Sequence, residues 1–316
     1  MKISVLDAST LGQDLSYDNL FDLGETIIYQ TTASGEVEKH IADSDVVIVN
    51  KIKLNESNLK NARNLKLICV AATGFDNIDI NYCKSKKIAV CNVVGYSTNS
   101  VAQVTIAMAL SLATNLTEFT QFVNDSSYTN SGIANKLTPV YNELAGKTWG
   151  VVGMGNIGKQ VARVAKALGC NVVGFRRNPD NDFPYLPLDE LFKVSDIISV
   201  HLPLTDETRG IINKDIVSLI KKNAIFINVA RGAVTDEETL ADMLLKGKIG
   251  GLGIDVYSTE PFPPSHPFHK LLNNPRVCLT PHMAWGAFES RKRCLEEIVL
   301  NIKAYYKNEI RNRLDI

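Results

Sequence analysis

A glycine-rich run, Gly-Met-Gly-Asn-Ile-Gly at residues 153–158, limits what this chain can fold into more than any other feature of the sequence. Between a strand and a helix, Gly153 allows a tight turn, Gly155 lets a pyrophosphate approach the backbone, and Gly158 lets the helix pack closely on the strand. The first N–H groups of the helix and the positive end of its dipole then face the anion. The run therefore indicates a phosphate-binding turn.

The residues around this run supply the strands and the helix that a phosphate-binding turn needs. Residues 147–152 are rich in β-formers, and apolar residues recur at helical spacing over 157–168. Gly169 is a plausible stop for that helix, and residues 171–175 form a second β-rich run. The segments make a βαβ unit of the required length, so we prefer a dinucleotide site to a purely structural glycine turn.

Short β-rich runs alternate with helical stretches along most of the chain, which predicts parallel sheets with helices on both faces. The runs are 3–6, 26–29, 46–49, 66–70 and 88–91, and then 197–202, 224–230, 250–256 and 277–280. We expect an α/β protein of two doubly wound domains, with a Rossmann dinucleotide-binding domain inserted into a flavodoxin-like substrate domain. The expected domains are 100–287 for the dinucleotide and 1–99 with 288–316 for the substrate.

Two helix starts are predicted from capping boxes. Ser100 with Gln103 precedes a mostly apolar stretch at 101–123, which we expect to be one long buried helix. Thr235 with Glu238 precedes a helix that ends near Gly247.

Three further segments are assigned by composition. Residues 124–140 are polar and weakly periodic, so they form an arm rather than core. Residues 260–267 are rich in proline and form a loop, and 288–308 form a final amphipathic helix.

Composition excludes several classes of partner. The 316 residues carry no net charge, so no basic surplus favours nucleic acid or an anionic membrane. The apolar run at the amino terminus is too short for a signal peptide, and no stretch reaches the roughly 20 residues of a membrane span, so we expect a cytoplasmic protein.

The six cysteines lack CxxC pairs, which predicts reduced, mostly buried thiols and no metal site.

Polar residues that could carry chemistry follow several predicted strands: His201, Arg231, Asp255 with Glu260, and His282. An arginine can hold a carboxylate with two hydrogen bonds, and a histidine paired with a carboxylate can exchange a proton near neutral pH. Arg231, Glu260 and His282 therefore predict an acid/base site. Spacing alone leaves other interpretations open, namely a surface ion pair for Arg231, a structural histidine at 282 and a solvated acid at 260.

The ordered motifs resemble those of the D-isomer-specific 2-hydroxyacid dehydrogenases over nearly the whole chain. The similar segments are 72–79, 152–159, 201–208, 228–232, 253–261 and 281–282. The resemblance implies an NAD(P)-dependent enzyme that transfers a hydride between a nicotinamide and a small 2-oxo acid or D-2-hydroxy acid. It also implies a reaction in a cleft between the domains, which closure would shield from water.

The resemblance implies a role for each site residue. His282 is the implied acid/base, Glu260 the partner that favours and orients its imidazolium, and Arg231 the residue that holds the substrate carboxylate and polarises the carbonyl. Thr73 and Gly74 lie where backbone N–H groups bind the same carboxylate. The residues implied to bind the cofactor are Gly153, Gly155, Asn156, Ile157, Gly158, Arg176, Arg177, His201, Pro203, Thr208, Val229, Ala230 and Asp255, the last at the nicotinamide carboxamide.

Two positions refine the expected chemistry. Arg176 and Arg177 stand where an NAD enzyme usually places the acid that binds the ribose hydroxyls, so we favour NADP(H), with NAD(H) as the alternative. Trp285, together with the segments 96–103 and 281–285, is similar to the glycerate dehydrogenase or hydroxypyruvate reductase branch. An indole beside the substrate could limit side-chain size and offer an N–H, which favours hydroxypyruvate or glyoxylate; otherwise it only packs under the final helix.

Other functions stay open at this stage. The fold also suits a dinucleotide-sensing protein, of the transcriptional corepressor kind, that regulates without turnover. A dehydrogenase for another 2-oxo acid such as pyruvate, or one for an inorganic or non-carboxylate substrate, is a further alternative. The arm at 111–140 resembles the family's dimerisation region, so we expect a symmetric homodimer.

Overall fold

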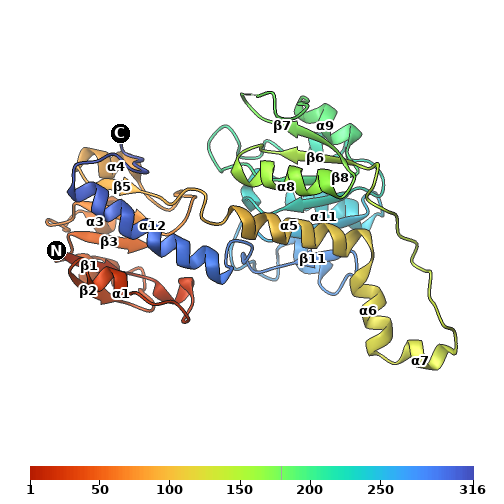
Figure 1. The fold of residues 1–316 in the computed structure, drawn as a ribbon, viewed down its shortest axis with the longest axis horizontal. Helices are drawn as coiled ribbons and strands as arrows, with labels where there is room; N and C mark the ends of the chain where they lie inside the picture. Colours follow the sequence, from red (N-terminus) through yellow and green to blue (C-terminus); the bar gives the residue numbers. More distant parts are fainter. Residues whose placement is uncertain (179) are drawn as a thin grey trace. The chain divides into compact units, whose positions relative to one another are not determined.

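The computed structural model describes residues 1–178 and 180–316, which form two compact units. Unit 1 comprises Met1–Ser97 and Gly286–Ile316, and unit 2 comprises Thr98–Trp285. Each unit is built on its own parallel sheet with helices on both faces (Figure 1). The expected α/β class with two doubly wound sheets is therefore confirmed. The junctions between the units fall close to the boundaries that the sequence indicates.

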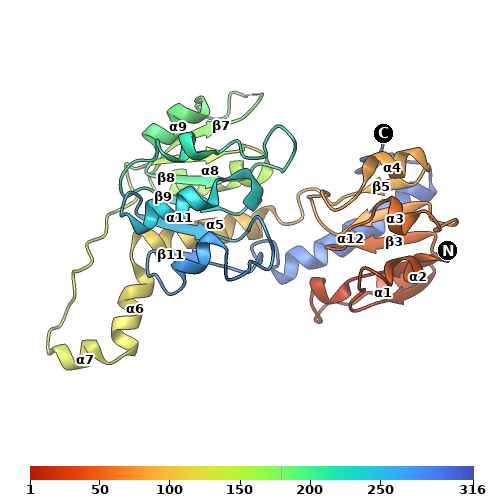
Figure 2. The same ribbon diagram turned by 180° about the vertical axis from the view of Figure 1, so that it is seen from behind.

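The sheet of unit 1 has the strand order β2-β1-β3-β4-β5, which is that of flavodoxin-like folds. Its strands are β1 (Lys2–Val5), β2 (Glu25–Ile28), β3 (Val46–Val49), β4 (Leu67–Val70) and β5 (Ala89–Cys91). Its helices are α1 (Asp18–Phe21), α2 (Val37–Ile41), α3 (Glu56–Leu59), α4 (Ile80–Ser85) and α12 (Phe288–Tyr306), with a 3-10 turn at Ala8–Leu11. The predicted final helix is thus confirmed as α12. It covers one face of the sheet (Figure 1), and α2 and α3 cover the other (Figure 2).

The sheet of unit 2 has the order β11-β10-β9-β8-β6-β7, in which the chain reverses direction across the sheet between β6 and β8. Its strands are β6 (Thr148–Val152), β7 (Asn171–Phe175), β8 (Ile197–Val200), β9 (Ile225–Asn228), β10 (Gly251–Ile254) and β11 (Val277–Leu279). A parallel bridge between Gly174 and Tyr185 extends it beyond β7. Dinucleotide folds bind their ligand at such a reversal, outside the carboxyl ends of the strands.

Helices cover both faces of this second sheet. They are α5 (Thr98–Ala113), α6 (Leu116–Asn124), α7 (Ser127–Ser131), α8 (Asn156–Ala167), α9 (Leu188–Val194), α10 (Lys214–Val217) and α11 (Glu237–Leu245), with 3-10 turns at Gly232–Val234 and Pro267–Leu271. Helices α5 and α8 pack together against one face, over the fully buried Trp149. Helices α9, α10 and α11 pack on the opposite face.

The expectation of one buried helix at 101–123 is wrong. Asn115 has a φ of 51°, and at this point the chain bends by 67° from α5 into α6. Helix α5 has buried residues, but none of the described residues of α6 is buried. Helices α6 and α7 project from the body of unit 2 (Figure 1), and both lie within the arm at 111–140 that the sequence indicates.

Both predicted capping boxes are also wrong. Ser100 lies inside α5, and its hydroxyl donates to the carbonyl of Ala284 at 2.6 Å instead of capping the helix. Helix α11 is capped by Asp236, whose carboxylate accepts from Thr239 N at 2.9 Å. The hydroxyl of Thr235 donates to the Gly232 carbonyl, since the preceding 3-10 turn brings that acceptor within reach.

The six cysteines are free thiols, and all but Cys278 are buried. Within residues 1–178 and 180–316, His, Cys, Asp and Glu side chains nowhere gather in a group of three that could hold a metal ion. In the same ranges, no single helix is long and apolar enough to cross a membrane, although α5 and α6 would be by length and composition when taken as a bent pair.

Candidate active site

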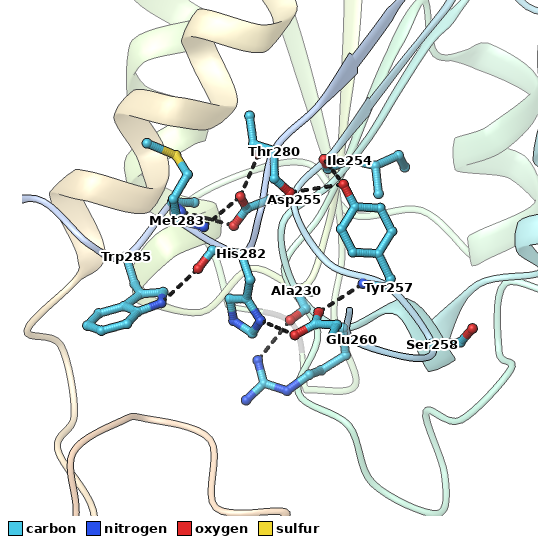
Figure 3. Close-up of polar contacts among 12 residues, drawn as sticks. Ala230, Ile254, Asp255, Tyr257, Ser258, Glu260, Thr280, His282, Met283 and Trp285 are labelled. Atoms are coloured by element: carbon cyan, nitrogen blue, oxygen red, sulfur yellow. Dashed lines mark hydrogen bonds and ion pairs between the residues drawn. The ribbon is translucent and has the colours of Figure 1, made fainter. Parts of the chain in front are cut away.

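Asp255 anchors the loop that carries His282. It directly follows β10, and the loop follows the neighbouring strand β11, so both leave the sheet at the same edge. The Asp255 carboxylate is buried and accepts hydrogen bonds from Thr280 Oγ1 at 2.6 Å, Met283 N at 2.9 Å and Ala284 N at 3.0 Å (Figure 3). Burial raises the pKa of Asp255, and these donors oppose that rise. The carboxylate therefore fixes the loop on both sides of His282.

His282 has a backbone conformation that side-chain-bearing residues rarely adopt. Its φ is 53°, in the left-handed region, where the cost must be offset by surrounding contacts. Its N–H donates to the Thr280 carbonyl at 3.0 Å, and its carbonyl accepts from Trp285 Nε1 at 3.0 Å. The indole N–H that we expected to face the substrate thus has a partner in the protein, with which a substrate would compete.

The imidazole of His282 points at Glu260 (Figure 3). Nδ1 lies 2.7 Å from Glu260 Oε2, and Glu260 Oε1 accepts from Tyr257 N at 2.9 Å. Because a carboxylate can only accept, the proton of this contact belongs to His282 Nδ1, and Nε2 becomes the nitrogen that can exchange a proton with a substrate. The side chains are 20% and 34% exposed, so the pair is accessible from solvent.

A second, buried pair lies behind the Glu260 loop, and the sequence patterns did not reveal it. Glu237 accepts from Ser258 N through Oε1 at 2.9 Å, and its Oε2 lies 2.9 Å from His266 Nε2. Both side chains are less than a tenth exposed. Ser258 is next to Tyr257, the residue that holds Glu260, so this pair braces the loop from inside. The sequence feature that could have indicated this pair was His266, which lies in the proline-rich loop at 260–267.

Arg231 reaches the same edge from β9, the other neighbour of β10. Its turn is closed by Asn228, whose amide donates to the Arg231 carbonyl and accepts from Ala230 N, both at 3.0 Å. A side chain at Gly232 would lie 2.1 Å from the carbonyl carbon of Tyr257, so only glycine lets this turn lie against the Glu260 loop. Three adjacent strand ends thus bring Arg231, Glu260 and His282 to one edge of unit 2.

The glycine turn between β6 and α8 shows why Gly153 and Gly158 are required. Gly153 has a φ of +101°, and a Cβ there would lie 2.7 Å from the backbone carbon of His201. A Cβ at Gly158 would lie 2.2 Å from the Gly153 carbonyl oxygen, which would prevent the close approach of helix and turn. At Gly155 a Cβ would meet nothing described within 4 Å. This open space over the first turn of α8 suits an anion.

His201, at the end of β8, has one ring nitrogen without a partner. Trp149 Nε1 donates to Ser199 Oγ at 3.0 Å, and His201 Nε2 lies 3.0 Å from the same hydroxyl. The other ring nitrogen, Nδ1, is buried and without a hydrogen-bond partner among the described residues. Burial lowers the pKa of His201 to about 3, so the ring stays neutral.

The remaining residues assigned to the cofactor also lie in unit 2. Thr208 Oγ1 donates to the Pro203 carbonyl at 2.6 Å in the loop after β8, and Val229 and Ala230 are buried after β9. Arg176 follows β7 and pairs with Asp180, a contact that the sequence did not reveal, and Arg177 pairs with Glu207 at 2.6 Å.

Thr73 and Gly74 belong to unit 1 and follow the end of β4. The Thr73 hydroxyl donates to the Val93 carbonyl at 2.8 Å, and the Thr73 carbonyl accepts from Asn92 Nδ2 at 2.8 Å. These contacts fix the turn, while no hydrogen bond within the described ranges uses the N–H of Thr73 or Gly74.

Comparison with known proteins identifies the family. A family model described as "D-isomer specific 2-hydroxyacid dehydrogenase, NAD binding domain" matches residues 106–284, more than half of the chain. The chain belongs to the D-isomer-specific 2-hydroxyacid dehydrogenases. It is 35% identical to a hydroxypyruvate reductase of Blautia hydrogenotrophica, over 97% of each chain.

Two solved structures show the same fold as this dehydrogenase. One is a D-lactate dehydrogenase of Aquifex aeolicus complexed with NAD and lactic acid, with a TM-score of 0.87, 32% identity and coverage of 100% of this chain and 99% of that one. The other is an NADPH-dependent glyoxylate/hydroxypyruvate reductase of Sinorhizobium meliloti, with a TM-score of 0.85, 27% identity and coverage of 99% and 96%.

The resemblance drawn from the sequence is thereby confirmed, and the protein is an NAD(P)-dependent oxidoreductase. The structure fits such a cofactor, since there is open space at Gly155, and His201, whose buried Nδ1 has no partner among the described residues, lies against Gly153 of the same glycine turn. One of these two structures is a complex with NAD, and the other, of an NADPH-dependent enzyme, is a complex with NADP, so the family leaves the choice between these cofactors open.

Proposed function

We propose that this dehydrogenase reduces small 2-oxo acids of the hydroxypyruvate or glyoxylate type to D-2-hydroxy acids, with NADPH preferred to NADH. The observation that carries the proposal is the pair of His282 and Glu260 at 2.7 Å, beside the strand end that bears Arg231. A proton donor and a guanidinium at one edge suit a reaction that places negative charge on a carbonyl oxygen. The relatives named for hydroxypyruvate, glycerate and glyoxylate support the substrate class.

Each residue of the site has a separate task in this proposal. When bound, NADPH supplies the hydride that reduces the carbonyl carbon. His282 Nε2 delivers a proton to the carbonyl oxygen, while Glu260 holds Nδ1 and so fixes the direction in which Nε2 points. Arg231 binds the substrate carboxylate with its planar fork and stabilises the charge that develops on oxygen.

Thr73 and Gly74 complete the recognition of the carboxylate in this proposal. Their backbone N–H groups lie in a turn that Thr73 and Asn92 hold rigid, and rigid donors lose little entropy when they bind an anion. Replacing Gly74 by proline removes one donor, so KM for the 2-oxo acid should rise while the Kd of NADPH stays unchanged.

Steady-state kinetics with a panel of 2-oxo acids and both reduced cofactors test the proposed activity. Hydroxypyruvate or glyoxylate should give the highest kcat/KM, and pyruvate and bulky aromatic 2-oxo acids lower values. NADPH should give a higher kcat/KM than NADH, since Arg176 replaces the acid that repels a 2′-phosphate. Equal or better use of NADH would refute the cofactor preference. Failure to reduce any 2-oxo acid, with tight dinucleotide binding, would favour a dinucleotide-sensing protein instead.

Variants at Arg231 separate the effect of its two-pronged contact with the substrate carboxylate from the effect of its positive charge. Arg231→Ala should lower kcat/KM by roughly two to four orders of magnitude, because it removes both the carboxylate clamp and a charge at the oxygen. Arg231→Lys keeps the charge and loses the fork, so it should recover only part of the loss. Dinucleotide affinity, measured by titration of tryptophan fluorescence, should be unchanged in both variants. Near-normal turnover in Arg231→Ala would remove this residue from the mechanism.

We also propose that two copies of the chain pair through the arm. Its apolar side chains are largely exposed: Leu137 by 74%, Val140 by 75% and Ile133 by 63%. A stretch of exposed apolar residues of this kind usually marks an interface. Sedimentation equilibrium should give a dimer for the wild type and a monomer for Leu137→Asp with Val140→Asp. A wild-type monomer at micromolar concentration would refute the proposal.

A further inference from the structure

Asp180 lies at the centre of a charged cluster beyond the carboxyl end of β7. Its Oδ2 accepts from Lys159 Nζ at 2.7 Å and also pairs with the guanidinium of Arg176. Its Oδ1 accepts from the Tyr185 hydroxyl at 2.7 Å and from Asp182 N at 3.1 Å. Both carboxylate oxygens are thus held in place, although 32% of the side chain is exposed.

The two cations of this cluster come from the elements that form the adenosine side of a dinucleotide site. Arg176 follows the last residue of β7, where this fold places the side chain that contacts the ribose 2′ position. Lys159 lies in the first turns of α8, which begins directly after the glycine turn. Asp180 therefore stands where the cofactor's 2′ substituent binds.

The balance of charge in the cluster distinguishes the two cofactors. Lys159 also pairs with Asp182 at 2.5 Å, so that two carboxylates match the two cations. The pKa of Asp180 lies well below its usual range, mainly because the Lys159 ammonium bonds to this carboxylate. Asp180 is therefore ionised at any pH near neutral. A 2′-phosphate needs the cations as partners and is repelled by a carboxylate, whereas a 2′-hydroxyl tolerates both groups.

We propose that Asp180 is a specificity-determining residue that restrains NADP(H) binding by competing with the 2′-phosphate for Arg176 and Lys159. The inference deepens the proposed function, since it rests on binding of the adenosine ribose beside Arg176. Arginine at this strand end favours NADP(H), and Asp180 offsets part of that preference. Neutralising Asp180 shifts the enzyme toward NADP(H), by on the order of tenfold for one exposed charge at this range.

Calorimetric titration of the purified protein with adenosine 2′,5′-bisphosphate and with AMP tests the competition without turnover. In Asp180→Asn, affinity for the bisphosphate should rise about tenfold, while affinity for AMP should stay unchanged. Unchanged AMP binding also shows that the site is folded. Asp182→Asn is the matched control, and it should give a smaller rise because Asp182 reaches Lys159 alone. An equal rise in Asp182→Asn would overturn the assignment, as would a fall in AMP affinity without a gain for the bisphosphate.

The kinetic ratio of the two cofactors separates this inference from the proposed function. If the wild type prefers NADH and Asp180→Asn raises the ratio of NADPH to NADH kcat/KM, the proposed preference fails and the role of Asp180 stands. If the wild type prefers NADPH and the ratio is unchanged in Asp180→Asn, the role of Asp180 fails alone. In Arg176→Ala, neutralising Asp180 should give less than half the wild-type gain, because one of the contested cations is gone. An undiminished gain there would overturn the competition.

Discussion

Acidification should destabilise unit 2 through His201, and the structure gives the size of the effect. The ring nitrogen Nδ1 is buried, and burial lowers the pKa of His201 from 6.5 to about 3. As pH falls below about 6.5, the unfolded chain takes up a proton that the folded chain refuses until about pH 3. Acid therefore favours unfolding throughout this window, and stability is regained as pH rises through it.

The expected loss follows from the linkage relation. One pKa unit corresponds to about 1.4 kcal/mol, so each pH unit below about 6.5 lowers the unfolding free energy by about that amount. Between about pH 6.5 and about pH 5 the loss through His201 is at most about 2 kcal/mol. It is an upper figure because part of the residue is exposed.

Urea unfolding at several pH values, followed by tryptophan fluorescence, measures this loss. Trp149 and Trp285 both belong to unit 2, so the signal reports the unit that contains His201. His201→Gln removes the titrating ring, and the loss of stability between neutral pH and about pH 5 should shrink by up to about 2 kcal/mol. His269→Gln, at an exposed histidine, is the control. The same pH dependence in wild type and His201→Gln would refute the reasoning.

Three further substitutions test other contacts of the site. Asp255→Ala leaves the N–H groups of Met283 and Ala284, the second of them buried, without their acceptor, so the unfolding free energy of unit 2 should fall by about 1–3 kcal/mol and kcat/KM should fall with it; a urea midpoint unchanged from wild type would contradict this. Glu237→Ala removes the side chain that braces the Glu260 loop, so kcat should fall about tenfold while the Kd of NADPH stays unchanged. Glu237→Gln still accepts from Ser258 N and should recover much of the lost kcat. Equal activity of the two variants would argue against the bracing role. Gly158→Ala forces α8 away from the turn and should raise the Kd of NADPH, measured by fluorescence titration, at least about tenfold. The control is Gly35→Ala, because a Cβ at Gly35 meets nothing within 4 Å. Equal Kd values for the two variants would contradict the role of close packing.

Local patterns in the sequence were sufficient to predict the strands of the fold. Runs such as Val46–Val49 are apolar at every position because parallel strands are covered on both faces. This pattern therefore identifies a strand whatever its register with its neighbours. The glycine turn is equally local, since Gly153 is required by its positive φ and Gly158 by the close approach of backbone to backbone. The ordered motifs around it then indicated the family, and with it the roles expected for Arg231, Glu260 and His282.

The sequence predictions failed at three places, each for a different physical reason. Ser100 has the spacing of a cap, but its hydroxyl donates to Ala284, far along the chain. Asp236, and not Thr235, caps α11, because the 3-10 turn at Gly232–Val234 moves the start of the helix by one residue. A break at Asn115 turned one expected helix into two, since a positive φ at a single residue redirects the chain without a change of hydrophobic pattern.

The sequence by itself determined the two α/β units, the glycine turn and the residue types available for acid/base chemistry, because period, turn residues and motif order are properties of neighbouring positions. Only the tertiary structure decided which of those side chains meet. The order of β9, β10 and β11 brings Arg231, Glu260 and His282 to one edge, and it lets Asp255 hold a strained His282 in place. The same folding sets Asp180 on Arg176 and Lys159, where charges from separate elements balance one another. Such pairings depend on distances across the sheet, which spacing along a chain does not encode.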